Sequence, residues 1–138
     1  MKEINNRNFD KNNIMKPFFH VANVILIIFY LFPGSVLGCF LYSDCNIQPR
    51  LTPDFIVSSN HVYIFILISF LGLAAYSKEK VSIKITIYLF FLSIFLEITH
   101  LVHPGRGFEV KDMAGNIVGV TISFIAFLIV KLKKINKF

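Results

Sequence analysis

Residues 81–103 read VSIKITIYLFFLSIFLEITHLVH, an apolar run of membrane-spanning length with a glutamate near its end. A transmembrane helix needs about 20 consecutive apolar residues. This stretch supplies them, with Lys84 close enough to its start to extend toward the headgroups. Comparable runs occur at about 18–42, 55–76 and 113–130. The sequence therefore predicts an all-α integral membrane protein, a bundle of four transmembrane helices.

The overall composition fits that class. The chain has 138 residues, enough for one domain, of which 55% are hydrophobic, and its mean hydropathy is +0.66. A soluble chain of this length could not bury so much apolar surface in one core. The net charge of +6 does not indicate nucleic-acid binding, because the basic residues flank the first and last apolar runs and form no stripe interleaved with aromatics.

The charged residues outside the spans predict the orientation. Cytoplasmic segments carry an excess of Lys and Arg, and such excesses occur before the first span, in the turn at 77–80 and after the last span. The loop at 43–54 has none, and neither does the loop after the third span, where Glu109 and Asp112 balance Arg106 and Lys111. We therefore expect both loops outside and both termini in the cytoplasm. The chain then divides into three segments, namely a disordered cytoplasmic tail at 1–16, a transmembrane domain at 17–130 and a basic cytoplasmic tail at 131–138.

The first apolar run contains Pro33-Gly34, a pair that should kink the helix or end its straight portion. A second interpretation stays open here, because residues 36–39, VLGC, loosely resemble the cleavage site of a lipoprotein signal peptide. The bulky Leu37 and an apolar run that continues to Tyr42 favour the uncut helix.

The chain has two cysteines, Cys39 and Cys45. Cys39 lies in the apolar run and is more typical of a small packing residue than of a reactive thiol. A disulfide between the two requires the loop after the run to double back, and two cysteines alone do not make a disulfide framework.

Polar residues inside the spans gather at one depth. Ionisable side chains in lipid are costly, so each needs a partner or a role. His61 lies in the outer part of the second span, Glu97 in that of the third, and Asn116 one turn into the fourth. Arg106 and Asp112 lie at the mouth of the bundle. Helical spacing predicts that these side chains face one another at the extracytoplasmic end.

Structural roles account for part of this set. Asp112, at the start of the fourth span, is most simply an N-cap that accepts hydrogen bonds from free helix amides. Gly115 and Gly119 form a G-x-x-x-G pair, which allows two helix backbones to approach closely in lipid. Asn116 fits either a hydrogen bond between helices or a contact with a ligand.

Glu97 and Arg106 carry the strongest indication of function. A carboxylate at the depth of Glu97 must be protonated, paired or hydrated. A structural role, in which Glu97 pairs with Arg106 or His61, and a functional role are equally supported by the sequence. Arg106 lies in the turn 104–107, PGRG, where glycines such as Gly105 allow the backbone to approach a ligand. A guanidinium at the outer leaflet is suited to a phosphate or a carboxylate.

A metal site is the weaker interpretation of the same residues. The Glu97-x-x-His100 motif, joined by His103, His61 and Asp112, contains ligand types that bind zinc or iron. In helical bundles, however, carboxylate-bridged sites use such motifs in pairs, and this chain has one copy. We therefore expect no metal and no other cofactor.

The residues around the cluster resemble the pattern of the VanZ-like family. That pattern is a Glu, then Pro-Gly-Arg, a short spacer, an Asp, and an Asn with a trailing Gly, and the resemblance covers about residues 54–130. The matching residues are Glu97, Pro104, Gly105, Arg106, Asp112, Asn116 and Gly119, with His61 and Phe65 matching an upstream His and aromatic. His100 departs from the pattern, standing where the family usually has Gln, and Val57-Ser58 replace an Asp-Lys pair.

The resemblance implies a multi-pass protein of the bacterial cytoplasmic membrane, in a family whose founding member is associated with teicoplanin resistance. We expect its outer-leaflet cluster to bind or modify an anionic lipid or a lipid-linked cell-wall component, which would lower glycopeptide susceptibility. Arg106 would contact the phosphate or carboxylate, with Glu97 and His61 positioning it or transferring a proton. The other expected ligand-binding residues are Gly105, Asp112 and Asn116.

Two other functions stay open. The cluster could act on a lipid phosphate as an enzyme, with His61 or Glu97 as the general base. The chain could instead be a non-catalytic scaffold for another membrane protein, which would pack on the face formed by Gly115 and Gly119. Nucleic acid is not an expected partner under any of the three.

Overall fold

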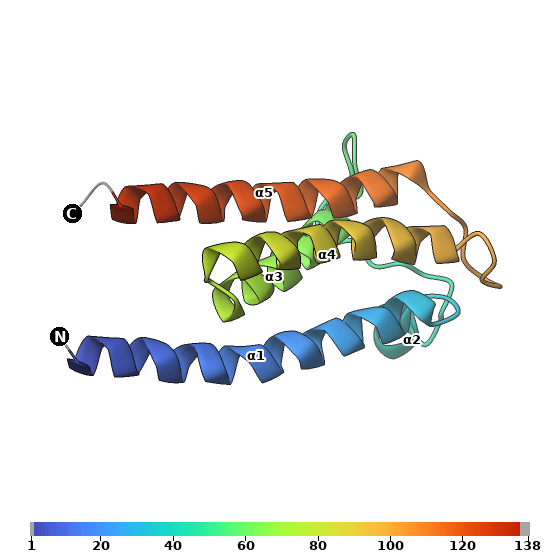
Figure 1. Cartoon of the computed structure of the whole chain (residues 1–138). Helices are drawn as coiled ribbons and strands as arrows, with labels where there is room; N and C mark the ends of the chain where they lie inside the picture. Colours follow the sequence, from blue (N-terminus) through green and yellow to red (C-terminus); the bar gives the residue numbers. More distant parts are fainter. Residues whose placement is uncertain (1, 136–138) are drawn as a thin grey trace.

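The computed structural model describes the backbone of residues 2–135 and the side chains of residues 14–78 and 80–133. Within that range all regular secondary structure is helical, as the sequence predicts. The helices are α1 (Lys2–Leu31), α2 (Val36–Tyr42), α3 (Ser59–Ala75), α4 (Glu79–Thr99) and α5 (Val110–Ile135). The four longer helices run alongside one another, and the start of α1, the α3–α4 turn and the end of α5 lie toward the same end (Figure 1).

Three of these helices are long and apolar enough to cross a membrane, by length and composition. The apolar segments are Ile14–Leu31, Lys80–Thr99 and Val110–Lys133, and they suggest a membrane protein. The second expected span, 55–76, forms a shorter apolar helix, because α3 begins only at Ser59.

Side-chain hydrogen bonds explain where α3 begins. Asp54 Oδ1 accepts hydrogen bonds from the backbone N–H of Ser59, at 2.8 Å, and from its hydroxyl, at 3.1 Å. Asn60 holds the preceding loop, donating to the carbonyl of Pro49 at 2.7 Å and accepting from the amide of Leu51 at 3.0 Å. These bonds satisfy amides that a helix start leaves free, so residues 55–58 remain outside the helix.

Both terminal segments differ from the sequence prediction. The disordered tail expected at 1–16 is wrong for residues 2–16, because α1 begins at Lys2 and continues through Pro17. Once the apolar part of a helix is formed, each added residue gains one hydrogen bond at little further cost. Residues 131–135 of the expected C-terminal tail are likewise helical and form the end of α5. Residues 136–138 of that tail lie outside the described residues.

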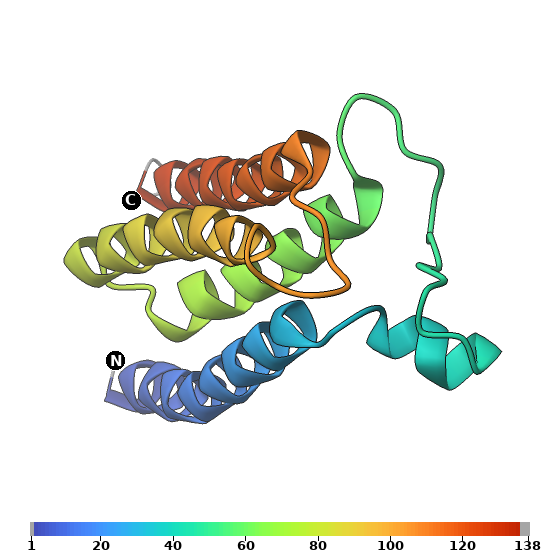
Figure 2. The same ribbon diagram turned by 90° about the vertical axis from the view of Figure 1, so that its right-hand side faces the viewer.

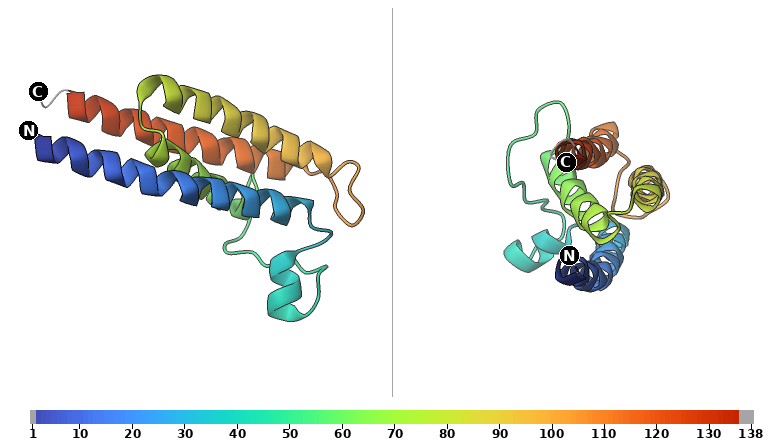
Figure 3. Two further views of the ribbon diagram at one scale, coloured as in Figure 1. Left: turned by 60° about the horizontal axis from the view of Figure 1, so that its bottom comes forward. Right: turned by 60° about the vertical axis from the view of Figure 1, so that its left-hand side comes forward.

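The first expected span is divided in two at the Pro33-Gly34 pair, which confirms that the pair ends the straight helix. Gly34 has a φ of +93°, a conformation that favours glycine. The chain then turns into the short helix α2, which lies to the side of the bundle (Figures 2 and 3). The following loop doubles back, so that Cys39 and Cys45 form a disulfide and the amide of Ser35 donates to the carbonyl of Cys45.

The glycines of α5 pack against α3 of the same chain. A Cβ at Gly115 would lie 2.7 Å from the carbonyl oxygen of Ser58, and a Cβ at Gly119 would lie 2.6 Å from that of Val62. The two backbones are therefore too close for any side chain between them. The face that the sequence offered to a partner protein is occupied by α3, which leaves it unavailable for a scaffold contact.

Candidate functional site

Asn116 is the centre of a buried polar cluster that joins all four long helices. Its Nδ2 donates to the backbone carbonyl of Ser93 on α4 at 3.1 Å, and this bond fixes the orientation of the amide. Its Oδ1 accepts from the hydroxyl of Tyr30 on α1 at 2.7 Å and lies 2.9 Å from Nδ1 of His61 on α3. Asn116 is fully buried, so it has the interhelical role that the sequence allowed.

These contacts determine which nitrogen of His61 carries a hydrogen. The Oδ1 of Asn116 can only accept, and the Tyr30 hydroxyl already donates its hydrogen to that oxygen. His61 Nδ1, 2.8 Å from the Tyr30 hydroxyl and 2.9 Å from Oδ1, must therefore be the donor to both. The other nitrogen, Nε2, lies 3.2 Å from Oδ2 of Asp112.

Asp112 is not the N-cap that the sequence predicts. Helix α5 begins at Val110, so Asp112 lies within its first turn, where a negative charge is favoured by the helix dipole. Its carboxylate pairs with His61 on α3. The amide of Asp112 donates to the carbonyl of Glu109, which means that the first turn is closed by backbone contacts and the side chain is left for the cluster.

Glu97 is fully buried and pairs with His100, the residue that follows the last residue of α4. Its Oε1 lies 3.2 Å from His100 Nδ1 and accepts from the amide of Glu109 at 3.1 Å. Its Oε2 is buried and has no hydrogen-bond partner among the described residues. Glu97 nevertheless lies close to His61 and Asp112. One possible ligand atom from each of the three residues lies within 4.8 Å of the other two.

His100, a minor member of the predicted site, is central to the structure. Its Nε2 lies 3.1 Å from the carbonyl oxygen of Tyr30, which can only accept, so Nε2 is the donor. Its ring stacks on the ring of Tyr30, with the centroids 5.6 Å apart and the planes inclined at 10°. His103, by contrast, is half-buried and contacts the carbonyl of Pro104 rather than the cluster.

Arg106 holds two loops together and does not reach the cluster. Its Nε and Nη2 donate to the carbonyl of Gly34 at 3.0 and 2.7 Å, and Nη2 also contacts the carbonyl of Phe29 at 3.4 Å. Phe29 belongs to the last turn of α1, where carbonyls lack helical partners. Gly105 has a φ of +81°, which places the turn beside Gly34. An ion pair of Arg106 with Glu97, one of the alternatives that the sequence left open, is absent from the described contacts.

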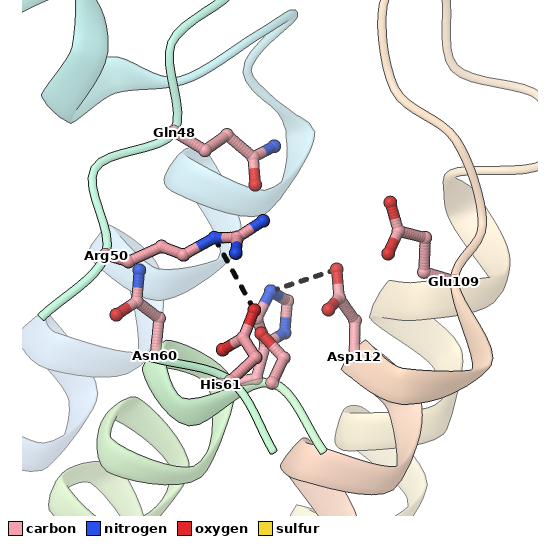
Figure 4. Close-up of a pocket in the computed structure, with 8 residues that line it drawn as sticks. Gln48, Arg50, Asn60, His61, Glu109 and Asp112 are labelled. Carbon is pink, nitrogen blue, oxygen red and sulfur yellow. Dashed lines mark ion pairs between the residues drawn. The ribbon is translucent and has the colours of Figure 1, made fainter. Parts of the chain in front are cut away.

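A polar pocket opens beside the cluster (Figure 4). Its lining residues are Gln48, Arg50, Asp54, Ser58, Asn60, His61, Glu109 and Asp112. His61 and Asp112 belong to both pocket and cluster, so they connect the pocket to the bundle interior. Arg50 is the cation of the pocket wall; its side chain is 67% exposed and its Nε lies 3.5 Å from Oδ2 of Asp54. Figure 4 shows Arg50 facing Asp112 and Glu109 across the pocket.

The sequence prediction brought His61, Glu97, Asp112 and Asn116 together correctly, and missed Tyr30 and Arg50. Tyr30 lies in an apolar run in which a tyrosine is unremarkable, and Arg50 lies in a loop without periodicity. For Arg50, the polar composition of its own loop, residues 43–54, was the one signal that the sequence offered.

No protein-family model, no curated protein and no solved structure matches the chain.

Proposed function

We propose that the chain is a multi-pass protein of the bacterial cytoplasmic membrane, in which α1, α3, α4 and α5 each cross the bilayer. Three of the four have the required length and composition. Helix α3 has 17 residues, a length of about 26 Å at 1.5 Å per residue. That is at the lower limit for spanning, and the exposed Phe55 and Ile56 just before it extend its apolar surface.

Charge and disulfide distribution support both termini in the cytoplasm. Four lysines lie toward one end of the bundle, namely Lys78 in the α3–α4 turn, Lys80 in the first turn of α4, and Lys131 and Lys133 near the end of α5 (Figure 1). Such an excess of lysines is typical of the cytoplasmic side. The Cys39–Cys45 disulfide lies at the other end, and disulfides persist in oxidising compartments outside the cytoplasm.

The pocket beside His61 and Asp112 carries the proposal for function. It lies at the disulfide end of the bundle, and a polar pocket at the outer leaflet of an otherwise apolar bundle is suited to a lipid headgroup. We infer that it binds an anionic lipid or a lipid-linked cell-wall component, as the resemblance to the VanZ-like family implies, and that it thereby lowers teicoplanin susceptibility. Arg50 replaces Arg106 as the proposed contact to the phosphate, because Arg106 is engaged by backbone carbonyls.

Lipid binding is tested with the purified chain in nanodiscs of neutral lipid, titrated with a polyprenyl phosphate and followed by native mass spectrometry. Loss of a hydrogen bond to a charged group costs about 1.5–3 kcal/mol, so we expect Arg50→Gln to weaken binding at least about tenfold. Lys80→Gln, at the opposite end, is the matched control and should leave binding unchanged.

Equal binding of the phosphate and of the corresponding neutral polyprenol would exclude the proposal, as would unchanged binding by Arg50→Gln. Release of inorganic phosphate in the same sample would instead identify an enzyme. In cells, deletion should raise teicoplanin susceptibility, and re-expression at native level should restore the original value.

A further inference from the structure

Three side chains from three helices converge in the polar cluster, and two of them, His61 and Asp112, also line the pocket. His61 comes from α3, Glu97 from α4 and Asp112 from α5, and one ligand atom from each lies within 4.8 Å of the other two. Imidazole nitrogen and carboxylate oxygen are donors that bind divalent metal ions. A cluster of acids alone does not indicate a metal, so further observations are needed.

The first such observation is the orphaned oxygen of Glu97. The residue is fully buried, and Oε1 accepts from an amide and contacts His100, whereas Oε2 has no hydrogen-bond partner among the described residues. Leaving a buried polar atom unpaired costs about 1–3 kcal/mol or more if it is charged. A cation bound by the carboxylate would satisfy that oxygen.

The second observation is the state of His61. Its Nδ1 is held as a hydrogen-bond donor by Tyr30 and Asn116. A neutral imidazole with the hydrogen on Nδ1 has its lone pair on Nε2, and Nε2 points at the carboxylate of Asp112. A cation placed between that nitrogen and the carboxylate would be bound by both. Metal-ligating histidines commonly have this arrangement, in which the second nitrogen donates to an oxygen and fixes the tautomer.

We propose that His61 Nε2, Glu97 and Asp112 bind a divalent transition-metal ion of the zinc or manganese class. Ligands at about 2.0–2.2 Å from one tetrahedral ion lie about 3.4 Å apart. The His61–Asp112 separation of 3.2 Å already fits, and the Glu97 ligand atom lies within 4.8 Å of the other two, so it has to move closer to join them. One nitrogen and two carboxylate ligands suit zinc or manganese rather than copper(I), which prefers sulfur.

Metal binding also explains how an anionic ligand could enter an acidic pocket. Asp54, Glu109 and Asp112 supply three carboxylates against the single guanidinium of Arg50. Without a bound cation, the excess of carboxylates would repel a phosphate. Three protein ligands leave a coordination position open, which His61 and Asp112 would direct into the pocket, and a phosphate oxygen could take that position. The metal site itself does not depend on the proposed lipid function.

The experiment measures metal binding by the full chain in nanodiscs without added anionic lipid. After chelation and desalting, the protein is titrated with Zn²⁺ or Mn²⁺, and bound metal per chain is determined by plasma mass spectrometry. We expect one ion per chain and at least about tenfold weaker binding for Glu97→Gln and Asp112→Asn, since loss of even an outer-shell partner costs about 10–100-fold.

Glu109→Gln is the matched control, because its side chain lines the same pocket but is not one of the three proposed ligands. It should bind the ion as the original chain does. Should a ligand variant fail to fold, X-ray absorption of the zinc-loaded original chain decides, because one imidazole and two carboxylates are expected. Substoichiometric metal, sulfur ligation, or equal affinity in Glu97→Gln and Glu109→Gln overturns the proposal.

Two further combinations separate the metal site from the lipid function. Stoichiometric metal with no lipid binding supports the metal site and removes the lipid proposal. Lipid binding that persists in the presence of a chelator, by a chain that binds no metal, supports the lipid proposal and removes the metal site.

Discussion

The hydroxyl of Tyr30 donates to Oδ1 of Asn116 at 2.7 Å, which joins the end of α1 to the start of α5 across 86 positions of sequence. The same hydroxyl accepts from His61, and the Tyr30 ring stacks on His100. One aromatic residue of α1 therefore contacts a residue of α3, a residue of α5 and the C-cap residue of α4. This makes Tyr30 the central positioning residue of the cluster.

Replacing Tyr30 by Phe should destabilise the bundle. The change keeps the ring but removes the hydroxyl, so that buried Oδ1 of Asn116 loses one of two donors. We expect a loss of about 1–2 kcal/mol in the free energy of unfolding, measured by thermal unfolding in detergent. Tyr42→Phe, at a tyrosine exposed on α2, is the control and should unfold like the original chain. Equal stability of the two variants would remove Tyr30 from this role.

Close packing of α3 on α5 predicts a strong effect of small substitutions at Gly119. A Cβ there meets the backbone carbonyl of Val62 at 2.6 Å, and backbone cannot move aside as a side chain can. We expect Gly119→Ala to cost about 1–3 kcal/mol, read from the midpoint of unfolding. Gly107→Ala is the matched control, because a Cβ at Gly107 has nothing within 4 Å. If Gly119→Ala were neutral, the two helices would be further apart than described.

The polar cluster could be predicted because helical spacing constrains direction as well as depth. His61, Glu97 and Asn116 lie at similar depth on spans whose other faces are apolar, so the sequence leaves few other arrangements. The partner of Glu97 could not be predicted in this way. His100 and Arg106 both lie close enough along the chain to pair with Glu97. Arg106 instead donates to the carbonyl of Gly34, so the partner of Glu97 depends on where the segment after α1 lies relative to the α4–α5 loop.

Tyr30 escaped prediction for a related reason, and the arrangement of the proposed metal ligands depends on the same packing. The helical pattern of α1 carries no polar signal at Tyr30, and its neighbours depend on how α1 packs on the other helices. The sequence analysis named His61 and Asp112 as possible ligands beside the Glu97-x-x-His100 motif, and it disfavoured a metal because the chain has only one copy of that motif. In the structure the candidate ligands come from separate helices, and His100 instead contacts the carbonyl of Tyr30.

Asp54 should make the start of α3 sensitive to acid. The hydrogen bond from the amide of Ser59 lowers the pKa of Asp54 below its ordinary value of 3.8, helped by the Ser59 hydroxyl and by Arg50. A lowered pKa means that the charged form is favoured in the folded state, so its stabilisation is complete above about pH 3.8 and is lost as the pH falls through the lowered pKa. Asp54→Ala should therefore be less stable than the original chain at neutral pH, with the difference shrinking in acid. A difference that stays constant with pH would contradict this role.

The Cys39–Cys45 disulfide offers a direct test of orientation. If this end of the bundle lies outside the cytoplasm, the bond should form in intact cells and be accessible from outside. We expect a membrane-impermeant maleimide to label the chain only after treatment with a membrane-impermeant reductant. A Cys39→Ser, Cys45→Ser double variant should remain unlabelled, which controls for other sites because the chain has only two cysteines. Labelling only after lysis would place this end in the cytoplasm, and labelling of intact cells before reduction would mean that the two cysteines lie outside without being joined.

Arg106 and Arg50 should have separable effects on stability and binding. Arg106 donates twice to the carbonyl of Gly34, so Arg106→Gln should lower stability by about 1–3 kcal/mol. Arg50 is mostly exposed, and its pair with Asp54 contributes little because exposed ion pairs are worth about 0–1 kcal/mol. Arg50→Gln should thus unfold like the original chain yet lose affinity for a polyprenyl phosphate. The reverse pattern, a stable Arg106→Gln with selectively lost binding, would restore Arg106 as the ligand contact and require the loop at Gly34 to open.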